Sequence, residues 1–366
     1  MAINLPCGQN GVESSNSGLV GDVYQLLSPY RFGLPSLGKK IKGQGTVMGS
    51  FTATEPAVMK WEGVDDKLAK MVSKANLDFA PERRRVREAF KDVQLQIDHP
   101  LFKMHYSGVQ TKEVKAFMFV DGIAKKLATS GYGVFALDYP GYGLSDGLHG
   151  YIPSFDSLVD DVAEHFSKVR ENPKYQSLPC FLFGQSMGGA VALKVHFKQP
   201  HAWDGAVLVA PMCKMGEDVL PPWPLLQLLT GISKIFPKMK LVPPKDIAEM
   251  GFKELKKREQ ASYNVIAYKD KPRLKTACEL LKTTQEIECQ LAQVSLPLLI
   301  LHGEADVLTD CSVSEALYEK ASSSDKEILI YKDACHSLLE GEPDETINLV
   351  LDNILSWLEK RCAKTE

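Results

Sequence analysis

The sequence predicts an α/β fold: a mostly parallel sheet covered by helices on both faces, with a helical cap. From residue 114 onward, apolar runs of five to eight residues alternate with stretches of helical period. Uninterrupted apolar runs are typical of strands buried on both faces, as in parallel sheets. One interval, residues 212–292, has helical patterns but no strong strand. The 366 residues suffice for one large domain or two modest ones.

The expected strands are six apolar runs. In chain order they are "VKAFMFV" (114–120), "GVFALD" (133–138), "CFLFG" (180–184), "AVLVAP" (206–211), "LPLLILHG" (296–303) and "KEILIY" (326–331). Only Asp121 and Gly122 are left for a turn between the first run and the helical stretch that follows it, residues 122–130. This strand-to-helix junction is unusually short.

Helical periodicity marks the elements between and around these runs. Two helices are expected upstream, one from Asp65 and one from Pro81, which is a favourable first-turn proline. Two more follow the second and the last run. Their apolar faces are Leu158, Val159, Val162, Phe166 and Val169, and Ile347, Val350, Leu351, Ile354 and Leu358.

The chain divides into four parts by composition and pattern. Residues 1–60 are rich in Gly, Ser and Pro without sustained periodicity, which predicts a disordered or targeting segment. Residues 61–113 form a helical extension, and residues 114–211 with 293–366 form the α/β core. Residues 212–292 are expected to cap the carboxyl ends of the strands, where open α/β sheets bind ligands.

Charge and cysteine usage exclude several classes of protein. The net charge is −3 without a prominent basic patch, so we expect no nucleic-acid partner. The eight cysteines form no C-x-x-C pair and no cluster with zinc spacing, so we expect free thiols, no metal and no cofactor.

The sequence also bears on membranes and compartment. Val219–Ser233 is apolar, but it holds three prolines and 15 residues against the roughly 20 that a spanning helix needs. The stretch 221–237 could instead touch a membrane surface from the cap. The chain start lacks the pattern of a secretory signal, which favours the cytoplasm. A plastid transit peptide is the alternative, although arginine is scarce there. The oligomeric state is not predicted.

A G-x-S-x-G motif, Gly184 to Gly188, lies between an expected strand and an expected helix. Such a turn holds the serine in a strained backbone conformation with its hydroxyl exposed above the sheet. Glycines two residues on either side allow strand and helix to approach closely. The helix N-terminus directs its free N–H groups at developing negative charge. Ser186 is therefore the candidate nucleophile.

A serine nucleophile needs a base and an orienting carboxylate, and in this architecture they follow in the order Ser, acid, His. Asp306 and Asp310 follow the run 296–303, and His336 follows the run 326–331. All lie past strand carboxyl ends, on the side of the sheet expected for Ser186. Asp306 is the better acid and His336 the better base. Asp310, Glu304 and Asp333 are expected to lie at the surface, and the other histidines are expected to be structural or exposed.

The motifs "GQSMGGA", "LHGEADVLTD" and "ACHSLLEGE" resemble the α/β-hydrolase family of monoacylglycerol lipases. They are most similar to its plant branch, which includes monoacylglycerol lipase-like proteins, lysophospholipase-like proteins and caffeoylshikimate esterases. Segments 138–161 and 203–215 are also similar to that branch. The resemblance implies Ser186 as nucleophile, Asp306 as acid, His336 as base and the Met187 N–H as an oxyanion donor. The cap would receive the acyl chain or another hydrophobic part of an ester.

The sequence departs from this family at one point. Members carry an H-G-x-G stretch directly after an early strand, and its backbone supplies the second oxyanion donor. Here the run 114–120 meets the helix directly, while His149-Gly150 and His302-Gly303 lie at other junctions. Earlier strands of the family are not apparent either. A block of the sheet, from just after Glu113 through the oxyanion loop, is therefore expected to be missing.

Two functional hypotheses follow. The first is a serine ester hydrolase that acts on a small-molecule ester through an acyl-enzyme on Ser186. The second is a catalytically impaired or non-catalytic ligand-binding protein with the hydrolase fold, because the H-G-x-G loop is absent. A peptidase of the proline-iminopeptidase type is a weaker third hypothesis. Haloalkane and epoxide hydrolases are disfavoured, because they carry a carboxylate where Ser186 stands. Monoacylglycerols, lysophospholipids and phenolic esters all stay open as substrates.

Overall fold

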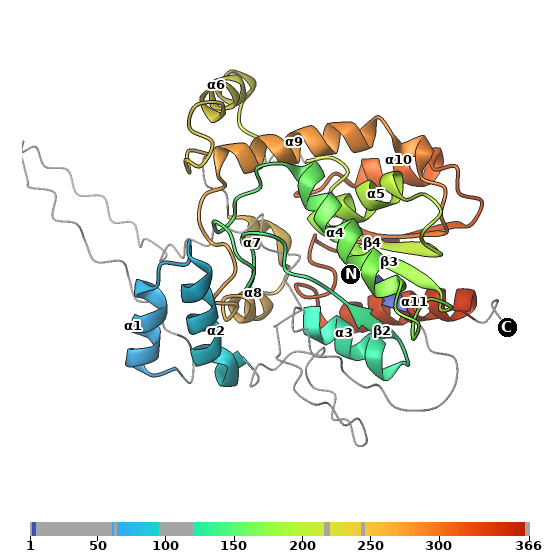
Figure 1. Ribbon diagram of the computed structural model, residues 1–366, viewed down its shortest axis with the longest axis horizontal. Helices are drawn as coiled ribbons and strands as arrows, with labels where there is room; N and C mark the ends of the chain where they lie inside the picture. The colour runs from blue at the N-terminus through green and yellow to red at the C-terminus, as the bar shows by residue number, and fades with distance from the viewer. Residues whose placement is uncertain are drawn as a thin grey trace, which may run out of the picture.

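The computed structural model describes residues 2–4, 61, 64–94, 120–215, 220–242 and 246–362. Within this part of the chain, one six-stranded sheet has helices on both faces (Figure 1). The strand order is β2-β1-β3-β4-β5-β6. The strands are β1 (Ala2–Asn4), β2 (Gly133–Phe135), β3 (Cys180–Gln185), β4 (Gly205–Val209), β5 (Leu298–Gly303) and β6 (Lys326–Tyr331). The predicted α/β fold is confirmed.

Strands β3 to β6 form a parallel sheet, as their continuous apolar sequences predict. Every residue of β3, β4 and β5 is buried, whereas β6 is partly exposed at the sheet edge. Strand β6 has the bounds of the predicted run. Strand β2 is shorter than its predicted run: it ends at Phe135, and Ala136, Leu137 and Asp138 lie outside it.

Strand β1 was not predicted. It pairs antiparallel with both β2 and β3, for example Ala2 with Phe135 and with Leu182. The prediction of a segment without regular structure is therefore wrong for Ala2–Asn4, and residues 5–60 lie outside the described residues. Three residues are too few for a periodic pattern, and this strand is defined by partners far away in the sequence.

The start of the core also differs from expectation. Helix α3 spans Val120–Thr129, so Val120 belongs to a helix and not to the end of a strand. Asp121 and Gly122, which were expected to form the turn before the helix, are also part of α3, so the prediction of a turn at these two residues is wrong. Residues 114–119 of the predicted first strand lie outside the described residues.

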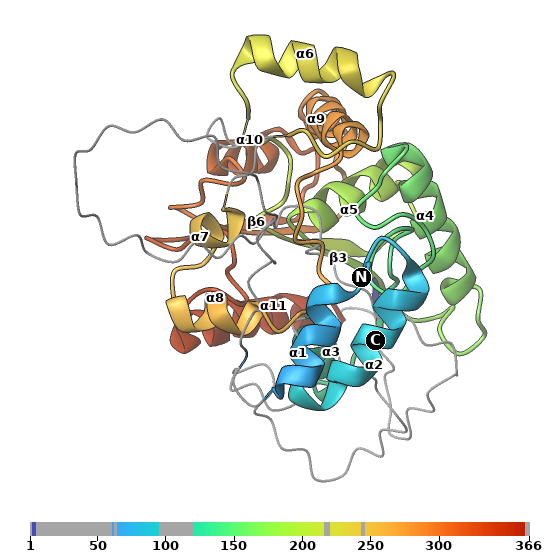
Figure 2. The same ribbon diagram turned by 90° about the vertical axis from the view of Figure 1, so that its left-hand side faces the viewer.

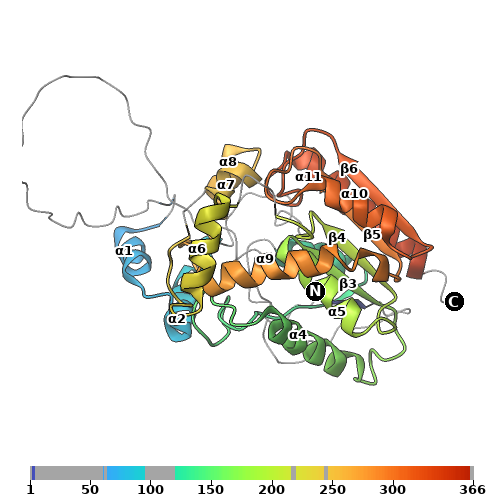
Figure 3. The ribbon, with the colours of Figure 1, turned by 90° about the horizontal axis from the view of Figure 1, so that it is seen from above.

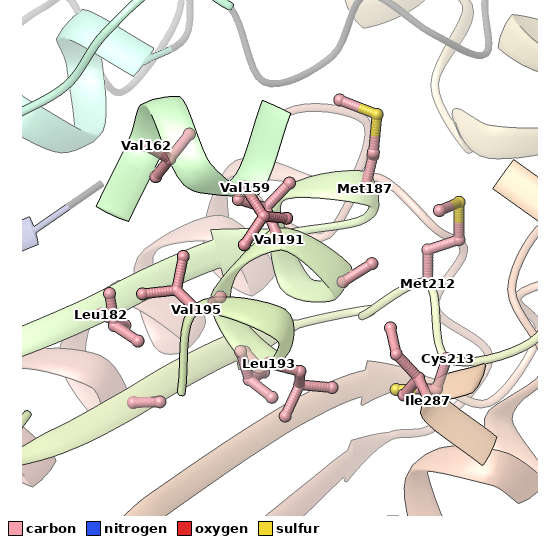
Figure 4. Packing of buried hydrophobic residues seen from close by; sticks show 14 of the residues in the cluster. Val159, Val162, Leu182, Met187, Val191, Leu193, Val195, Met212, Cys213 and Ile287 are labelled. Atoms are coloured by element: carbon pink, nitrogen blue, oxygen red, sulfur yellow. The ribbon is translucent and has the colours of Figure 1, made fainter. Parts of the chain in front are cut away.

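Helices cover the sheet in two layers. One face carries α4 (Phe155–Arg170), α5 (Met187–Lys198) and α10 (Cys311–Lys320), and the other carries α3 and α11 (Asp344–Cys362). Figure 4 shows the first layer at close range, where Val159 and Val162 of α4 lie beside Val191 and Val195 of α5. Alternate residues of β5 face the two layers, as the pleat of a strand requires.

Local signals define several of these helices. Ser154 caps α4 by accepting a hydrogen bond from the Ser157 N–H, with Lys168 and Arg170 in the last turn. Helix α11 begins with Asp344 and Glu345 and ends with basic residues. These charges oppose the helix dipole at both ends.

The described residues of the interval predicted as a cap form four α-helices. They are α6 (Trp223–Ser233), α7 (Ile247–Gly251), α8 (Leu255–Ala261) and α9 (Leu274–Glu288), and a short 3-10 helix, η2 (Leu291–Gln293), leads into β5. Helix α9 lies along α4 and α5, whereas α6 projects from the body of the molecule (Figure 2). Most of the apolar stretch at the start of this interval therefore belongs to α6, on the outside of the molecule.

The predicted N-terminal extension contains α1 (Asp66–Lys74) and α2 (Ala80–Gln94). They lie at the opposite end of the molecule from the C-terminus (Figure 3). Trp61, Val86 and Phe90 form an apolar cluster with Val265 and Ile266, which follow α8. The fully buried Arg83 of α2 donates hydrogen bonds to the carbonyls of a loop after β2, so the extension is fixed to both cap and core.

Candidate active site

Ser186 lies on the turn between β3 and α5. Its backbone angles, φ 51° and ψ −120°, lie in a region that residues other than glycine rarely adopt. The Ser186 N–H donates to the Val209 carbonyl at 3.0 Å, and its carbonyl accepts from the Met212 N–H at 2.9 Å. The chain around β4 therefore holds the strained turn in place from both sides.

Two glycines make this turn sterically feasible. A Cβ on Gly184 would lie 2.3 Å from the Gly188 carbonyl oxygen, and a Cβ on Gly189 would lie 2.6 Å from Pro211 Cβ. The sequence motif had pointed to Gly184 and Gly188. Gly189, one residue beyond the motif, marks a further close approach, where α5 meets the chain after β4.

Three predicted side chains meet at the carboxyl end of the sheet. Ser186 Oγ lies 3.0 Å from His336 Nε2, and His336 Nδ1 lies 2.7 Å from Asp306 Oδ2. Asp306 comes from the turn after β5, and His336 comes from the loop after β6. All three are buried. The chain of hydrogen bonds has the connectivity of a serine nucleophile, a base and an orienting acid.

The Asp306 carboxylate is fully buried and ringed by donors. Its Oδ1 accepts from the N–H groups of Leu308 and Thr309 at 2.8 and 3.1 Å. Burial by itself raises the pKa of Asp306, but the charge interaction with His336 and the hydrogen bonds from His302 and His336 outweigh it. The pKa of Asp306 is thereby held well below its ordinary value, and the carboxylate stays ionised.

Sequence reasoning missed two residues of this network. Thr309 Oγ1 lies 2.7 Å from Asp306 Oδ2 and 3.2 Å from His336 Nδ1. His302 Nε2 lies 3.1 Å from Asp306 Oδ2. The polar residue that ends an apolar strand in "LLILHG" was the available signal for His302. For Thr309, its spacing of three residues from Asp306 was the signal.

The other carboxylates of the two loops have different roles. Asp310 caps α10, accepting a hydrogen bond from the Ser312 N–H, and lies 3.6 Å from Lys214 Nζ. Glu304 accepts a hydrogen bond from the Asp333 N–H at 3.3 Å. Glu304 and Asp333 are exposed, as expected.

Met187 is the first residue of α5. The first N–H groups of a helix have no partner within the helix, so the Met187 N–H stays the expected oxyanion donor. Its side chain is buried. Among the described residues, no group of three or more His, Cys, Asp or Glu side chains is arranged to hold a metal ion.

Residues 116–344 match the sequence model of a family described as "Serine aminopeptidase, S33". The chain belongs to this family. The resemblance to the α/β-hydrolases is thus confirmed, and the names of relatives identify the branch. Caffeoylshikimate esterase of Arabidopsis thaliana is 33% identical to this S33-family chain, over 78% of the chain and 84% of the esterase. Human monoglyceride lipase is 31% identical, over 63% of the chain and 74% of the lipase.

Solved structures show the same fold. The Paleococcus ferrophilus monoacylglycerol lipase aligns with a TM-score of 0.57 and 22% identity, covering 65% of this S33-family chain and 88% of the lipase. A soluble variant of the Saccharomyces cerevisiae monoglyceride lipase, solved with a substrate analogue, gives a TM-score of 0.53 and 19% identity over 59% of the chain and 72% of the lipase. In the described part of the chain, no helix is both long and apolar enough to cross a bilayer.

Proposed function

We propose that this chain hydrolyses carboxylic esters through an acyl-enzyme on Ser186. The observation that carries the proposal is the pair of hydrogen bonds from Ser186 to His336 and from His336 to Asp306. Relatives named as an esterase and as monoglyceride lipases favour an ester over a peptide.

His336 moves the protons of both half-reactions. Its Nε2 takes the Ser186 hydroxyl proton as the oxygen attacks the ester carbonyl, and returns that proton to the leaving alcohol. A water molecule then gives a proton to Nε2 and attacks the acyl-enzyme, which releases the carboxylic acid and restores the serine. The Met187 N–H stabilises the oxyanion in both steps.

Asp306 acts on His336 in two ways. By accepting a hydrogen bond from Nδ1 it fixes the ring so that Nε2 faces Ser186, and its charge stabilises the imidazolium that forms. We expect Asp306→Asn to lower kcat about 10³–10⁴-fold at pH 7, since an amide cannot provide that charge. Asp310→Asn is the matched control and is expected to leave kcat close to that of the wild type. A similar loss in both variants would contradict this assignment of the acid.

The nucleophile can be tested directly. A fluorophosphonate probe and a short p-nitrophenyl ester are offered to the wild type and to Ser186→Ala. We expect the wild type to be labelled at Ser186 and to hydrolyse the ester, and the variant to do neither. Equal hydrolysis of the ester by the two proteins would contradict the proposal.

A ligand-binding protein with little turnover is the second candidate. The sequence has no H-G-x-G stretch where the predicted strand 114–120 runs into α3, and this absence favours the second candidate. Loss of one oxyanion donor costs roughly 10²–10³-fold in turnover. Labelling of Ser186 by the fluorophosphonate together with no measurable ester hydrolysis would support the second candidate over the first.

For the substrate, we propose an ester with a hydrophobic part that is taken up at a lipid surface. Helix α6 and the turn after it expose several large apolar side chains, namely Trp223, Leu228, Ile235, Phe236, Met239 and Leu241. Helix α6 packs against α9 and projects from the molecule (Figure 2). Lys234 and Lys238, in the same segment of the chain, are also exposed, and anionic lipid headgroups attract lysine side chains.

Sedimentation with anionic phospholipid vesicles tests the lipid contact. Replacing Ile235 and Phe236 by serine is expected to weaken binding at least tenfold, because two partly inserted apolar side chains are lost. Leu255→Ser is the control, since Leu255 of α8 is 74% exposed but lies outside the α6 face. Unchanged binding by the double variant would remove this part of the proposal.

A further inference from the structure

His302 contacts the same carboxylate oxygen as His336. Its Nε2 lies 3.1 Å from Asp306 Oδ2, and its Nδ1 lies 2.7 Å from Ser314 Oγ. The side chain is fully buried. On β5 it follows Leu298 and Ile300 in the alternation of the strand, so it faces the layer that contains α10, the helix of Ser314.

The partners of His302 determine where its proton lies. Asp306 Oδ2 and the Thr309 carbonyl, at 3.1 and 3.3 Å from Nε2, can only accept, so Nε2 carries a hydrogen. The Ser314 hydroxyl can donate to Nδ1 of a neutral ring or accept from Nδ1 of a protonated ring. His302 therefore donates to Asp306 in either charge state.

We propose that His302 is a positioning residue, which keeps Asp306 ionised and holds its Oδ2 toward His336 Nδ1. The proposal rests on the ester hydrolysis proposed above. Three side-chain groups converge on Oδ2, from His336, Thr309 and His302, at 2.7, 2.7 and 3.1 Å. With Oδ1 held by two backbone N–H groups, the carboxylate cannot rotate without losing several hydrogen bonds at once.

Removing His302 shifts the protonation of His336 in the same direction whether His302 is neutral or protonated. Without the Nε2–H donor, more of the Asp306 charge acts on His336 and favours its protonated form. If His302 is protonated, its loss also removes a repulsion between two imidazolium rings. In both cases the acid limb of the kcat/KM profile moves to higher pH.

Among the described residues, two thiols also interact with Asp306, those of Cys311 on α10 and of Cys335. Burial, and then nearby acidic groups, raise the pKa of Cys311 to about 11, and burial raises that of Cys335. Both thiols stay neutral where the acid limb falls.

The test compares His302→Leu with His302→Gln in p-nitrophenyl ester hydrolysis across pH. We expect the Leu variant to lose about tenfold in kcat with little change in KM. Its acid limb should move up by about one pH unit. The Gln amide can donate from near the position of Nε2, so the Gln variant should recover most of both effects. A folded Leu variant whose profile superimposes on the scaled wild-type profile would overturn the proposal, as would a Gln variant that matches Leu.

A second readout needs no turnover. In the Ser186→Ala background, the downfield proton resonance of the Asp306–His336 hydrogen bond should shift with His302→Leu and return with His302→Gln. If the wild type hydrolyses no ester, the proposed function fails, and this resonance alone decides the role of His302. If the Leu variant does not fold, Ser314→Ala replaces it and should move the resonance in the same direction; an unmoved resonance would overturn the proposal.

Discussion

At the scale of single residues, the Asp306 carboxylate concentrates the polar contacts of the site. It is fully buried, and its two oxygens accept from backbone, hydroxyl and imidazole groups. A buried charge with this many donors is stabilised in its ionised form far more than a carboxylate in water. Asp306 therefore links the chemistry of the site to the stability of the fold.

This link predicts how stability depends on pH. The pKa of Asp306 is lowered in the folded protein, where the effect of burial, which raises it, is outweighed by His336 and His302. Its contribution to stability is then complete above the unfolded carboxyl value of about 4. The contribution is lost as the pH falls from there toward the lower folded pKa.

The measurement is urea unfolding of wild type and Asp306→Asn between pH 7 and pH 3. Because Asn does not titrate, the wild-type free energy of unfolding should fall more steeply below about pH 4 than that of the variant. Parallel curves for the two proteins would contradict the lowered pKa.

At the scale of elements, the turn from β3 to α5 depends on how closely α5 approaches the chain after β4. Gly189→Ala places a methyl group 2.6 Å from Pro211 Cβ, in a region of well-packed backbone. We expect a loss of about 1–3 kcal/mol in the free energy of unfolding, because strand and helix must separate. The activity should also fall, since the same shift moves Ser186 away from His336.

A matched glycine serves as the control for this prediction. Gly231 lies within α6, and a Cβ added to it would meet no atom within 4 Å. Gly231→Ala should stabilise the protein by up to about 1 kcal/mol, the usual helix preference of alanine over glycine. Chemical denaturation of both variants tests the pair, and equal effects would argue against a steric origin.

A strand could be predicted from the sequence where its own residues show whether its two faces are buried. The apolar runs at β3, β4 and β5 are continuous because both faces of the sheet are covered there, so their pattern identified them. Strand β1 could not be found in this way, since its three residues are defined by pairing with Phe135 and Leu182. Ser186, Asp306 and His336 were found because strand ends converge. The contact of His302 with Asp306 depends on the shape of one turn and left only a weak signal.

At the scale of the whole molecule, Arg83 connects α2 to the core. Its guanidinium donates to the carbonyls of Gly143, Leu77 and Ser145 at 2.8, 2.8 and 2.6 Å, and the side chain is fully buried. A second arginine, Arg273 at the start of α9, donates to the carbonyl of His149 and to Asp78. Together they join extension, cap and core around the loop that follows β2.

We expect Arg83→Met to lower the free energy of unfolding by about 3 kcal/mol or more, because several buried carbonyls lose their donor at once. Arg85→Met changes a neighbouring arginine of α2 that is exposed and forms an i,i+3 pair with Glu82. That control should change stability little. Thermal unfolding of the two variants distinguishes a buried anchor from a general effect of charge on α2.

The left-handed backbone of Ser186 means that the protein is not at its stability optimum. Holding a side chain at φ 51° costs of order 1–3 kcal/mol. Ser186→Gly should therefore be inactive and yet unfold at a higher temperature than Ser186→Ala, which keeps the strain, even after the greater chain entropy of glycine is counted. Selection for stability alone would replace this serine, so its presence marks a position where activity is kept at the expense of the fold.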